Sequence, residues 1–416
     1  MTLEVNTSVT APTSFKKRIL LIGPGFVAAA TGVGTGDLVA SLVAGAGFGL
    51  VFIWAIIVGA ILKHFLNEGV GRWHLATGKT ILEGWQEMGK WATGYFGAYT
   101  VIWGFVYGAA ATSACALAMS TMFPIMPFWA WAIIHGIVGF LLIWTGRYQI
   151  FEKVMMVLIG LMFVTVIGSA ALFLPHLGDF AKGFVPTIPE GSFMLALGLI
   201  GGVGGTITMA SYGYWLKEKG WSGKEWIPTM RLDSKAAYIM TAVFTLSLLI
   251  VGSQFLYGTG INVKGEQGLF QLTELLGHKY GPIVSWLFLI GFWSAAFSSL
   301  LGVWNGVPYL FADFVRIVRK QTDRSGTEKD PAYRIYLAWL TFPPMLLLFF
   351  GKPVQLIILY GALGALFMPF LSFSLIWLLN KKVEKDYRSS LASNIVLTAC
   401  ILLFAILAVS KLISIF

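Results

Sequence analysis

The chain has 416 residues, of which 57% are hydrophobic and only 12% are charged. Ordinary soluble domains carry roughly 25% charged residues, so this composition excludes a soluble enzyme. The formal net charge of +10 would suit a nucleic-acid partner, but the basic residues lie in short polar gaps between apolar runs, which excludes that class. The composition predicts an all-α polytopic membrane protein whose surroundings are a lipid bilayer.

Helices that cross a bilayer core of about 30 Å need about 20 apolar residues each. Runs of this kind alternate with charged or turn-rich gaps along the whole chain. They predict eleven membrane-spanning helices, at about 19–47, 49–67, 96–121, 127–146, 153–174, 192–215, 234–257, 282–312, 333–351, 353–380 and 393–416.

The basic residues predict the orientation of these helices. When successive gaps are assigned to alternate sides, 24 of the 29 Lys and Arg residues fall on the side that holds the N-terminus. This assignment counts both Lys63, within the second run, and Arg72, after that run, on the side that holds the N-terminus. Because basic loops mark the cytoplasmic face, we expect the N-terminus inside and the C-terminus outside the cell membrane.

Glycine interrupts the first run near 34–36. The segment Gly32-Val33-Gly34-Thr35-Gly36 leads directly to Asp37, an acid near the middle of an otherwise apolar run. Each glycine costs about 1 kcal/mol of helix propensity relative to alanine, so the cluster predicts unwound backbone. A carboxylate at this depth costs about 2.5–3.5 kcal/mol on insertion scales and marks a substrate or ion path.

The sixth run contains a second glycine cluster, near 201–208. The first and sixth runs are the first members of two successive sets of five, and paired broken helices in two inverted repeats indicate a transporter binding site near the membrane midplane. The predicted organisation is a cytoplasmic tail at 1–18, a first repeat at 19–174, a second repeat at 190–380 and one further helix at 393–416. Close helix packing is the other explanation for such glycines.

Several motifs, taken in order, resemble those of one known family. The chain is similar to the natural resistance-associated macrophage protein (NRAMP) family of divalent metal transporters, whose first broken helix carries Asp-Pro-Gly-Asn. The resemblance spans nearly the whole chain and rests on order and spacing. Its residues are Gly23-Pro24-Gly25-Phe26, Gly34-Thr35-Gly36-Asp37, Leu75-Ala76-Thr77-Gly78-Lys79, Gly205-Thr206-Ile207 and Leu366-Phe367-Met368-Pro369-Phe370.

The resemblance implies a LeuT-type fold, in which ten helices form a 5+5 inverted repeat and an eleventh follows. This agrees with the number of apolar runs. It also implies a secondary transporter that moves metal ions inward by alternating access, commonly together with protons.

The family's metal ligands are only partly retained. When the chain is aligned without gaps, the family's Asp falls on Gly34, its Pro on Thr35 and its Asn on Asp37. In the sixth helix the family's Met falls on Thr208, and one inserted residue restores Met209 instead.

In the ungapped alignment Thr208 replaces the family's Met, so a thioether ligand is no longer assured. The thioether is the soft ligand that favours Mn, Fe and Cd over Mg and Ca. Oxygen ligands remain, and these suit a hard cation such as Mg, with Mn next. The predicted metal ligands are Asp37, Thr208 and Met209, and the wider site comprises Asp37, Gly34, Thr35, Gly204, Thr206, Thr208 and Met209. The cation is cargo, and no resident cofactor is expected.

Proton coupling is doubtful because parts of the family's relay are missing. The third run, from Gly97 to Met122, contains no acid, and the histidine of the family's sixth helix is replaced by Ala210 or Ser211. His135 in the fourth run is interpreted as a hydrogen-bonded packing residue.

A transporter of an organic amine or amino acid remains the alternative. In that hypothesis aromatic side chains surround Asp37 as a cation-π box, although ordinary packing also accounts for them. Those side chains are Trp103, Tyr107, Tyr212, Tyr214, Trp293 and Tyr360.

Two other classes are disfavoured. A sensor or scaffold would need an output module, and the longest polar gap near the second repeat, at 315–334, is too short for one. An enzyme is unexpected because no zinc spacing, phosphate-binding loop or nucleophile triad can be assembled. The acids outside Asp37 and Glu152 are placed mostly in loops, and Glu152 is expected to pair with Lys153. The number of associating copies is left open.

Overall fold

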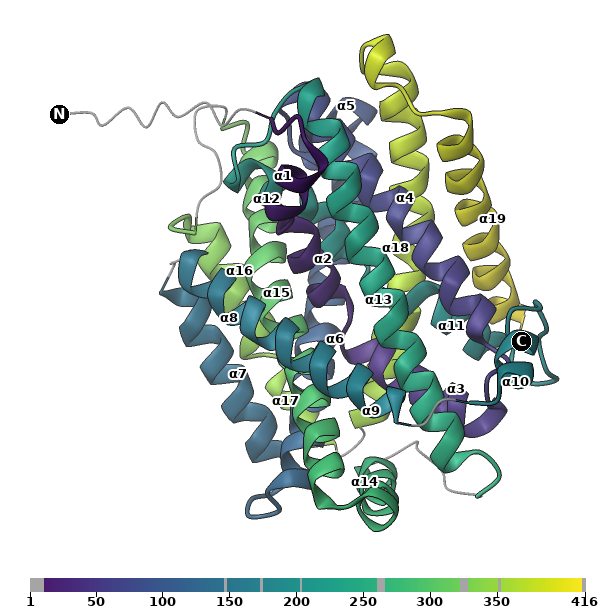
Figure 1. The fold of residues 1–416 in the computed structure, drawn as a ribbon. Coiled ribbons are helices and arrows are strands. Elements are labelled where there is room, and N and C mark those ends of the chain that lie inside the picture. The colour runs from purple at the N-terminus through teal and green to yellow at the C-terminus, as the bar shows by residue number, and fades with distance from the viewer. Residues whose placement is uncertain are drawn as a thin grey trace.

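The computed structural model describes residues 11–145, 148–172, 175–202, 204–259, 266–321, 328–350 and 353–413. In these ranges all regular secondary structure is helical, and the helices gather into one elongated bundle (Figure 1). The predicted all-α architecture is confirmed.

The first half of the chain contains helices that cover the first five predicted runs, with two short helices between runs. They are α1 (Phe15–Leu20), α2 (Pro24–Gly32), α3 (Thr35–Phe48), α4 (Ile53–Thr77), α5 (Ile81–Met88), α6 (Lys90–Met122), α7 (Phe128–Trp144), α8 (Tyr148–Met162), the π-helix η1 (Phe163–Ile167), α9 (Gly168–Ala171) and α10 (Leu177–Lys182).

The second half continues in the same way. Its elements are α11 (Phe193–Gly202), the 3₁₀ helix η2 (Ile207–Ser211), α12 (Tyr212–Glu218), η3 (Lys224–Trp226), α13 (Ile227–Leu256), α14 (Glu266–Tyr280), α15 (Pro282–Val318), α16 (Pro331–Thr341), α17 (Met345–Leu348), α18 (Pro353–Lys381), η4 (Lys385–Tyr387) and α19 (Leu391–Ile413).

Among the described residues, five helical segments are long and apolar enough to cross a membrane by themselves. They are Ile53–Thr77, Lys90–Met122, Gln149–Ala171, Lys224–Leu256 and Pro282–Val318. Shorter apolar helices lie in four of the six remaining predicted runs, at Asp37–Phe48, Phe128–Trp144, Leu366–Lys381 and Leu391–Ile406. Helix occupies at least part of every one of the eleven stretches. The number of actual crossings stays a prediction.

Both glycine-rich stretches interrupt their helices. The first stops at Gly32 and restarts at Thr35, and the second stops at Gly202 and resumes as the 3₁₀ turn η2. Gly204 and Gly205 have φ angles of 78° and 87°, a left-handed conformation that side chains other than glycine rarely adopt. The sequence uses glycine here because the backbone must turn.

The broken helices lie in the interior of the bundle. The two halves of the first, α2 and α3, pack along α13, and α2 also packs along α15. Small residues permit the α3–α13 approach, since a Cβ atom added to Gly45 would lie 2.3 Å from the Leu249 carbonyl oxygen. Gly252 on α13 is equally close to α3, where an added Cβ would meet the Leu42 carbonyl oxygen at 2.7 Å.

The second predicted run was drawn too short. Helix α4 extends from Ile53 to Thr77, so Lys63 and Arg72 lie inside it and not in a loop. Both side chains are buried, with relative exposures of 0% for Lys63 and 4% for Arg72. The error arose because the polar residues from Asn67 to Arg72 read as the end of a span, whereas the side chains of Asn67, Glu68 and Arg72 are buried.

Candidate functional site

The two helix breaks touch each other. A Cβ atom added to Gly32, at the end of α2, would lie 2.3 Å from the carbonyl carbon of Gly204. An added Cβ on Gly205 would in turn lie 2.9 Å from the Cα of Gly32. Only glycine at these positions lets the two unwound backbones meet, and their contact defines the candidate site.

Asp37 points at the break in the sixth helix. It lies in the first turn of α3, is 2% exposed, and its Oδ2 accepts a hydrogen bond of 3.2 Å from the Gly204 N–H. An acid in the first turn is also favoured by the helix dipole. The predicted carboxylate is therefore at the junction, on the protein side and away from lipid.

A second charge reaches the same junction, and the sequence analysis missed it. The Lys63 ammonium of α4 donates a hydrogen bond to the Gly205 carbonyl and interacts electrostatically with Asp37. The apolar residues on both sides of Lys63 were the signal, because they continue the helix past it. The site thus contains one negative and one positive side chain.

The other predicted site residues are distributed around the breaks. Gly34 is the N-cap of α3, and Thr208 faces Gly205, since a Cβ added there would lie 2.6 Å from the Thr208 hydroxyl oxygen. The buried Thr206 hydroxyl lies by the Tyr360 phenol and makes no hydrogen bond of normal geometry among the described residues.

The structure gives less support for two of the predicted site residues, Met209 and Thr35. Met209 is buried in the hydrophobic core of the bundle. The side chain of Thr35 lies outside the described residues, although its backbone begins α3. Whether Thr208 or Met209 corresponds to the family's thioether stays a prediction.

Groups freed by the first break are satisfied by neighbouring helices. The Ser299 hydroxyl of α15 donates to the Thr31 carbonyl at 2.8 Å, and the Tyr107 phenol of α6 donates to the Ser299 carbonyl at 3.1 Å. Unwound backbone at membrane depth is tolerated only with such partners. The neighbouring helices therefore stabilise the break in the first helix.

Three of the six aromatic side chains considered for a cation-π box gather near the site. Trp103 stacks on Tyr107 at 4.7 Å between ring centroids, and Tyr360 packs against Tyr107 at 5.0 Å. The Trp103 indole N–H is buried and has no hydrogen-bond partner in the described part of the chain.

The other three aromatic side chains form hydrogen bonds to polar residues other than Asp37. The Tyr212 phenol donates to Asp233, Tyr214 donates to Asp313, and Trp293 donates to His135. His135 Nδ1 is also hydrogen-bonded to the Trp131 carbonyl at 2.7 Å, which confirms its interpretation as a packing residue.

Asp233 explains the first motif of the family resemblance. Its two carboxylate oxygens accept the backbone N–H groups of Gly23 at 3.0 Å and Gly25 at 2.6 Å, at the beginning of α2. A Cβ atom on Gly25 would lie 2.6 Å from this carboxylate. Helix N-termini favour negative charge, so the motif is an anchor for α2 on α13.

Several acids placed in loops by the sequence analysis are buried within helices. Asp233, Asp313 and Glu68 are 0%, 2% and 4% exposed. Glu68 of α4 accepts hydrogen bonds from Arg72 and from Arg231, the latter at 2.9 Å.

The predicted local pair of Glu152 with Lys153 is wrong. Glu152 instead forms a salt bridge with Lys219, which follows α12. This contact connects two helices that are far apart in sequence.

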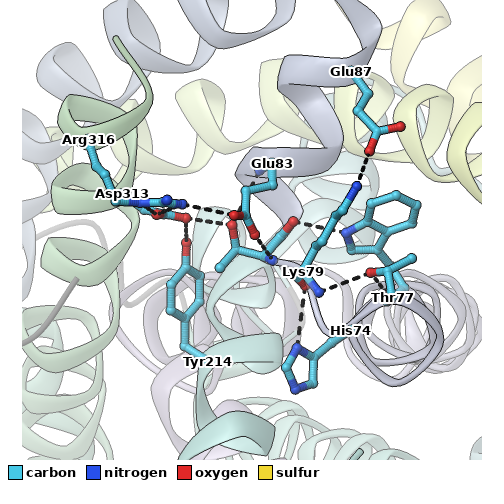
Figure 2. A network of polar contacts seen from close by, with 10 residues as sticks. His74, Thr77, Lys79, Glu83, Glu87, Tyr214, Asp313 and Arg316 are labelled. Atoms are coloured by element: carbon cyan, nitrogen blue, oxygen red, sulfur yellow. Dashed lines mark hydrogen bonds and ion pairs between the residues drawn. The ribbon is translucent and has the colours of Figure 1, made fainter. Parts of the chain in front are cut away.

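A polar network joins three helices at the end of the bundle where α5 lies, here called the α5 end (Figures 1 and 2). Asp313 of α15 accepts from Thr80 at 2.5 Å and from Tyr214 of α12 at 2.7 Å. Arg316 donates to Asp313 at 2.7 Å and to Glu83 of α5 at 3.1 Å. The network therefore fastens the second half of the sixth helix to α15.

Glu83 has two roles in this network. Its side chain and that of Thr80 form a reciprocal capping box that starts α5. Partial burial raises the pKa of Glu83, but the hydrogen bonds from Thr80 and Arg316 outweigh burial and hold the pKa below its ordinary value. The carboxylate is therefore ionised at neutral pH.

Comparison with known proteins decides the family. Residues 25–414 match the sequence model of the family described as natural resistance-associated macrophage protein-like. The chain belongs to this family. Proteins of the NRAMP family are transporters embedded in membranes, so the prediction that the chain is not an enzyme is confirmed.

Two curated proteins are similar to most of the chain. The uncharacterized membrane protein YcsG of Bacillus subtilis is 23% identical over 380 residues, covering 89% of each chain. The divalent metal cation transporter MntH of Latilactobacillus sakei is 23% identical over 338 residues, covering 76% of this chain and 72% of its own.

Solved structures confirm the LeuT-type fold. The manganese transporter of Eremococcus coleocola, in complex with an aromatic bis-isothiourea compound, has a TM-score of 0.79 at 15% identity, covering 98% of this chain and 90% of its own. Mhp1, a nucleobase-cation-symport-1 family transporter, has a TM-score of 0.61 at 14% identity, covering 97% and 94%.

Proposed function

We propose that the protein is a secondary transporter that carries a divalent metal cation across the cell membrane. The main support for this proposal is the Asp37 carboxylate, which is buried at the contact of two broken helices in an NRAMP-family bundle. An intramembrane acid at such a place marks an ion path. The MntH relatives, whose names state divalent metal cation transport, support the same cargo.

The oxygen-rich surroundings favour a hard cation. No group of three or more His, Cys, Asp or Glu side chains able to hold a metal occurs among the described residues, so carbonyl and hydroxyl oxygens must complete the shell around Asp37. Such a shell suits Mg, and Mn next, better than softer ions. The Thr208 hydroxyl is the proposed partner on the second break.

Alternating access is proposed to open and close the α5 end. The Asp313 network holds α12 against α15, and opening a path from the site toward this end requires the two helices to separate. We assign the α5 end to the cytoplasm because basic residues gather there. Lys79 and Lys382 both pair with Glu87 of α5, and Lys224 pairs with Asp386, four residues after Lys382.

Tyr214→Phe is expected to loosen the α5 end. The change removes one hydrogen bond to the Asp313 carboxylate, a loss of about 1.5 kcal/mol or roughly tenfold in an opening equilibrium. Hydrogen–deuterium exchange of η2 and α12 should accelerate by about that factor. Tyr257→Phe, at an exposed tyrosine, is the matched control and should change nothing. Unchanged exchange in Tyr214→Phe would show that the network does not hold the helices together.

Transport without proton coupling is the proposed mode. The third-run helix α6 contains no acid, so it offers no carboxylate that could pass a proton across the membrane. Proteoliposomes containing the full chain should take up Mn²⁺ equally well with and without a pH gradient, and empty liposomes should not. Titration calorimetry should give heat with Mg²⁺ or Mn²⁺. Absence of both uptake and heat would reject the proposed cargo.

Thr208→Met is expected to shift selectivity toward softer cations. A thioether in place of the hydroxyl favours Cd²⁺ and Mn²⁺ over Mg²⁺, so the Cd²⁺-to-Mg²⁺ affinity ratio should rise about tenfold. Met209→Leu, which keeps side-chain volume, is the comparison variant. A loss of Cd²⁺ binding in Met209→Leu, without an effect at Thr208, would assign the family's thioether position to Met209.

An organic amine or amino acid is the second candidate cargo. It is favoured by the Trp103 indole N–H, which has no hydrogen-bond partner among the described residues and lies in the aromatic group with Tyr107 and Tyr360. An indole donor of this kind suits a carboxylate or carbonyl group. Heat on titration with amino acids, and none with metal ions, would select this candidate.

A further inference from the structure

Lys63 ends in the middle of the proposed site. It lies ten residues after the first residue of α4, a 25-residue helix, and therefore about 15 Å along the helix axis. Its relative exposure is 0%. A lysine at the centre of a membrane helix costs about 2.5–3.5 kcal/mol on insertion scales, so such residues are retained for function.

The ammonium and the Asp37 carboxylate bind the backbone of two consecutive residues of the second break. Lys63 donates to the carbonyl of Gly205, and Asp37 accepts from the N–H of Gly204. The carbonyl taken by the ammonium belongs to the set that would coordinate a transported cation. One of those oxygens is therefore already occupied by a positive charge.

The charges around the ammonium come from few groups. Lys63 interacts electrostatically with Asp37 of α3 and with the Cys400 thiol of α19. Among the described residues, Asp37 is the carboxylate that offsets it at the break. With both groups ionised the site has no net charge, which is a poor environment for a divalent cation.

A buried acceptor that could take the ammonium lies one helical turn along α4. Asn67, four residues after Lys63 on α4, has a buried side-chain oxygen with no hydrogen-bond partner in the described part of the chain. Its amide nitrogen donates to the Ser234 hydroxyl at 3.1 Å, which fixes the oxygen as the free acceptor. Residues four apart on a helix are neighbours, and the lysine side chain is flexible.

We propose that Lys63 is a specificity-determining residue whose ammonium occupies the cation position between the two breaks, and that a cargo cation binds only when the ammonium moves from Gly205 to Asn67. This inference rests on the proposed cation site and adds a built-in competitor to it. Competition from the ammonium keeps the affinity of the site for the cargo cation low. As the cargo leaves, the ammonium returns to the Gly205 carbonyl.

Lys63→Met and Lys63→Gln test the competition directly. Both remove the charge, and the glutamine keeps a donor for Gly205, so at least one variant should retain the fold. Calorimetric titration of the purified full chain with MnCl₂ should show at least about tenfold tighter binding in both, because a unit charge a few ångströms from a divalent ion is strongly repulsive. Mn²⁺ should also raise their thermal midpoints more than that of the unmodified protein.

Matched variants separate charge at the site from charge elsewhere. Lys235→Met removes the same charge from an exposed position on α13 and should leave Mn²⁺ affinity unchanged. Asn67→Leu removes the second acceptor and should weaken binding, but not in a chain that also carries Lys63→Met. Ser234→Ala, which removes only the partner of the Asn67 amide, controls for the lost hydrogen bond.

The possible results distinguish a failure of this inference from a failure of the proposed cargo. Equal or weaker Mn²⁺ binding in both Lys63 variants, or binding in no variant at all, would overturn the inference. Binding in the Lys63 variants alone, with no metal binding or uptake by the unmodified protein, would reject the proposed cargo and leave the role of Lys63 standing. Equal effects of Asn67→Leu in both backgrounds would reject the second acceptor.

Discussion

Asp37→Asn should abolish cation binding and uptake. The asparagine oxygen can still accept the Gly204 N–H, so the contact between the breaks is retained while the negative charge is lost. Without that charge, oxygen dipoles alone face the Lys63 ammonium and the incoming cation. We expect at least about a hundredfold loss of Mn²⁺ affinity, equivalent to about 2.7 kcal/mol.

The measurement is uptake into proteoliposomes together with calorimetric titration. Asp179→Asn provides the matched control, since Asp179 is an exposed acid on α10 that pairs with Lys182, three residues further on. Asp37→Glu keeps the charge and should retain part of the binding. Unchanged uptake in Asp37→Asn would remove this residue from the site.

Gly32→Ala should disrupt the junction itself. The added methyl group would lie 2.3 Å from the Gly204 carbonyl carbon, and backbone cannot move aside as a flexible side chain can. Overpacking of this kind costs about 1–3 kcal/mol and would push the two breaks apart. We expect a lower thermal midpoint and loss of uptake.

Gly47→Ala is the control for that variant. Gly47 lies in α3, and a Cβ atom there would meet nothing within 4 Å. Alanine should therefore leave transport unchanged, with a gain of up to about 1 kcal/mol in helix propensity. If Gly32→Ala behaved like Gly47→Ala, the close contact of the breaks would not be required for function.

The sequence predicted features that depend on local patterns. Dense glycine clusters near the middle of two apolar runs predicted both interruptions to within a few residues. Asp37 stood out because it was a single acid in an apolar run. The family resemblance then placed these features in the LeuT-type fold.

Partners that are distant in the chain could not be predicted. Asp233 binds Gly25 across 208 positions, and nothing near either residue indicates the other. Asp233 also lies among charged neighbours that read as a loop, although helix α13 begins before it. Lys63 was missed for a different reason, because its charge counted it among the cytoplasmic basic residues although it lies within an apolar run.

The anchoring of α2 has a consequence for how this molecule can move. Its first turn is held by Asp233 of α13, and its last turn by Ser299 of α15. The two attachments differ in strength, since one is a carboxylate that binds two N–H groups and the other is a single hydroxyl. When the bundle rearranges, α2 and α13 should move together as one rigid unit. The contact between Thr31 of α2 and Ser299 of α15 should break first, so that α2 slides along α15.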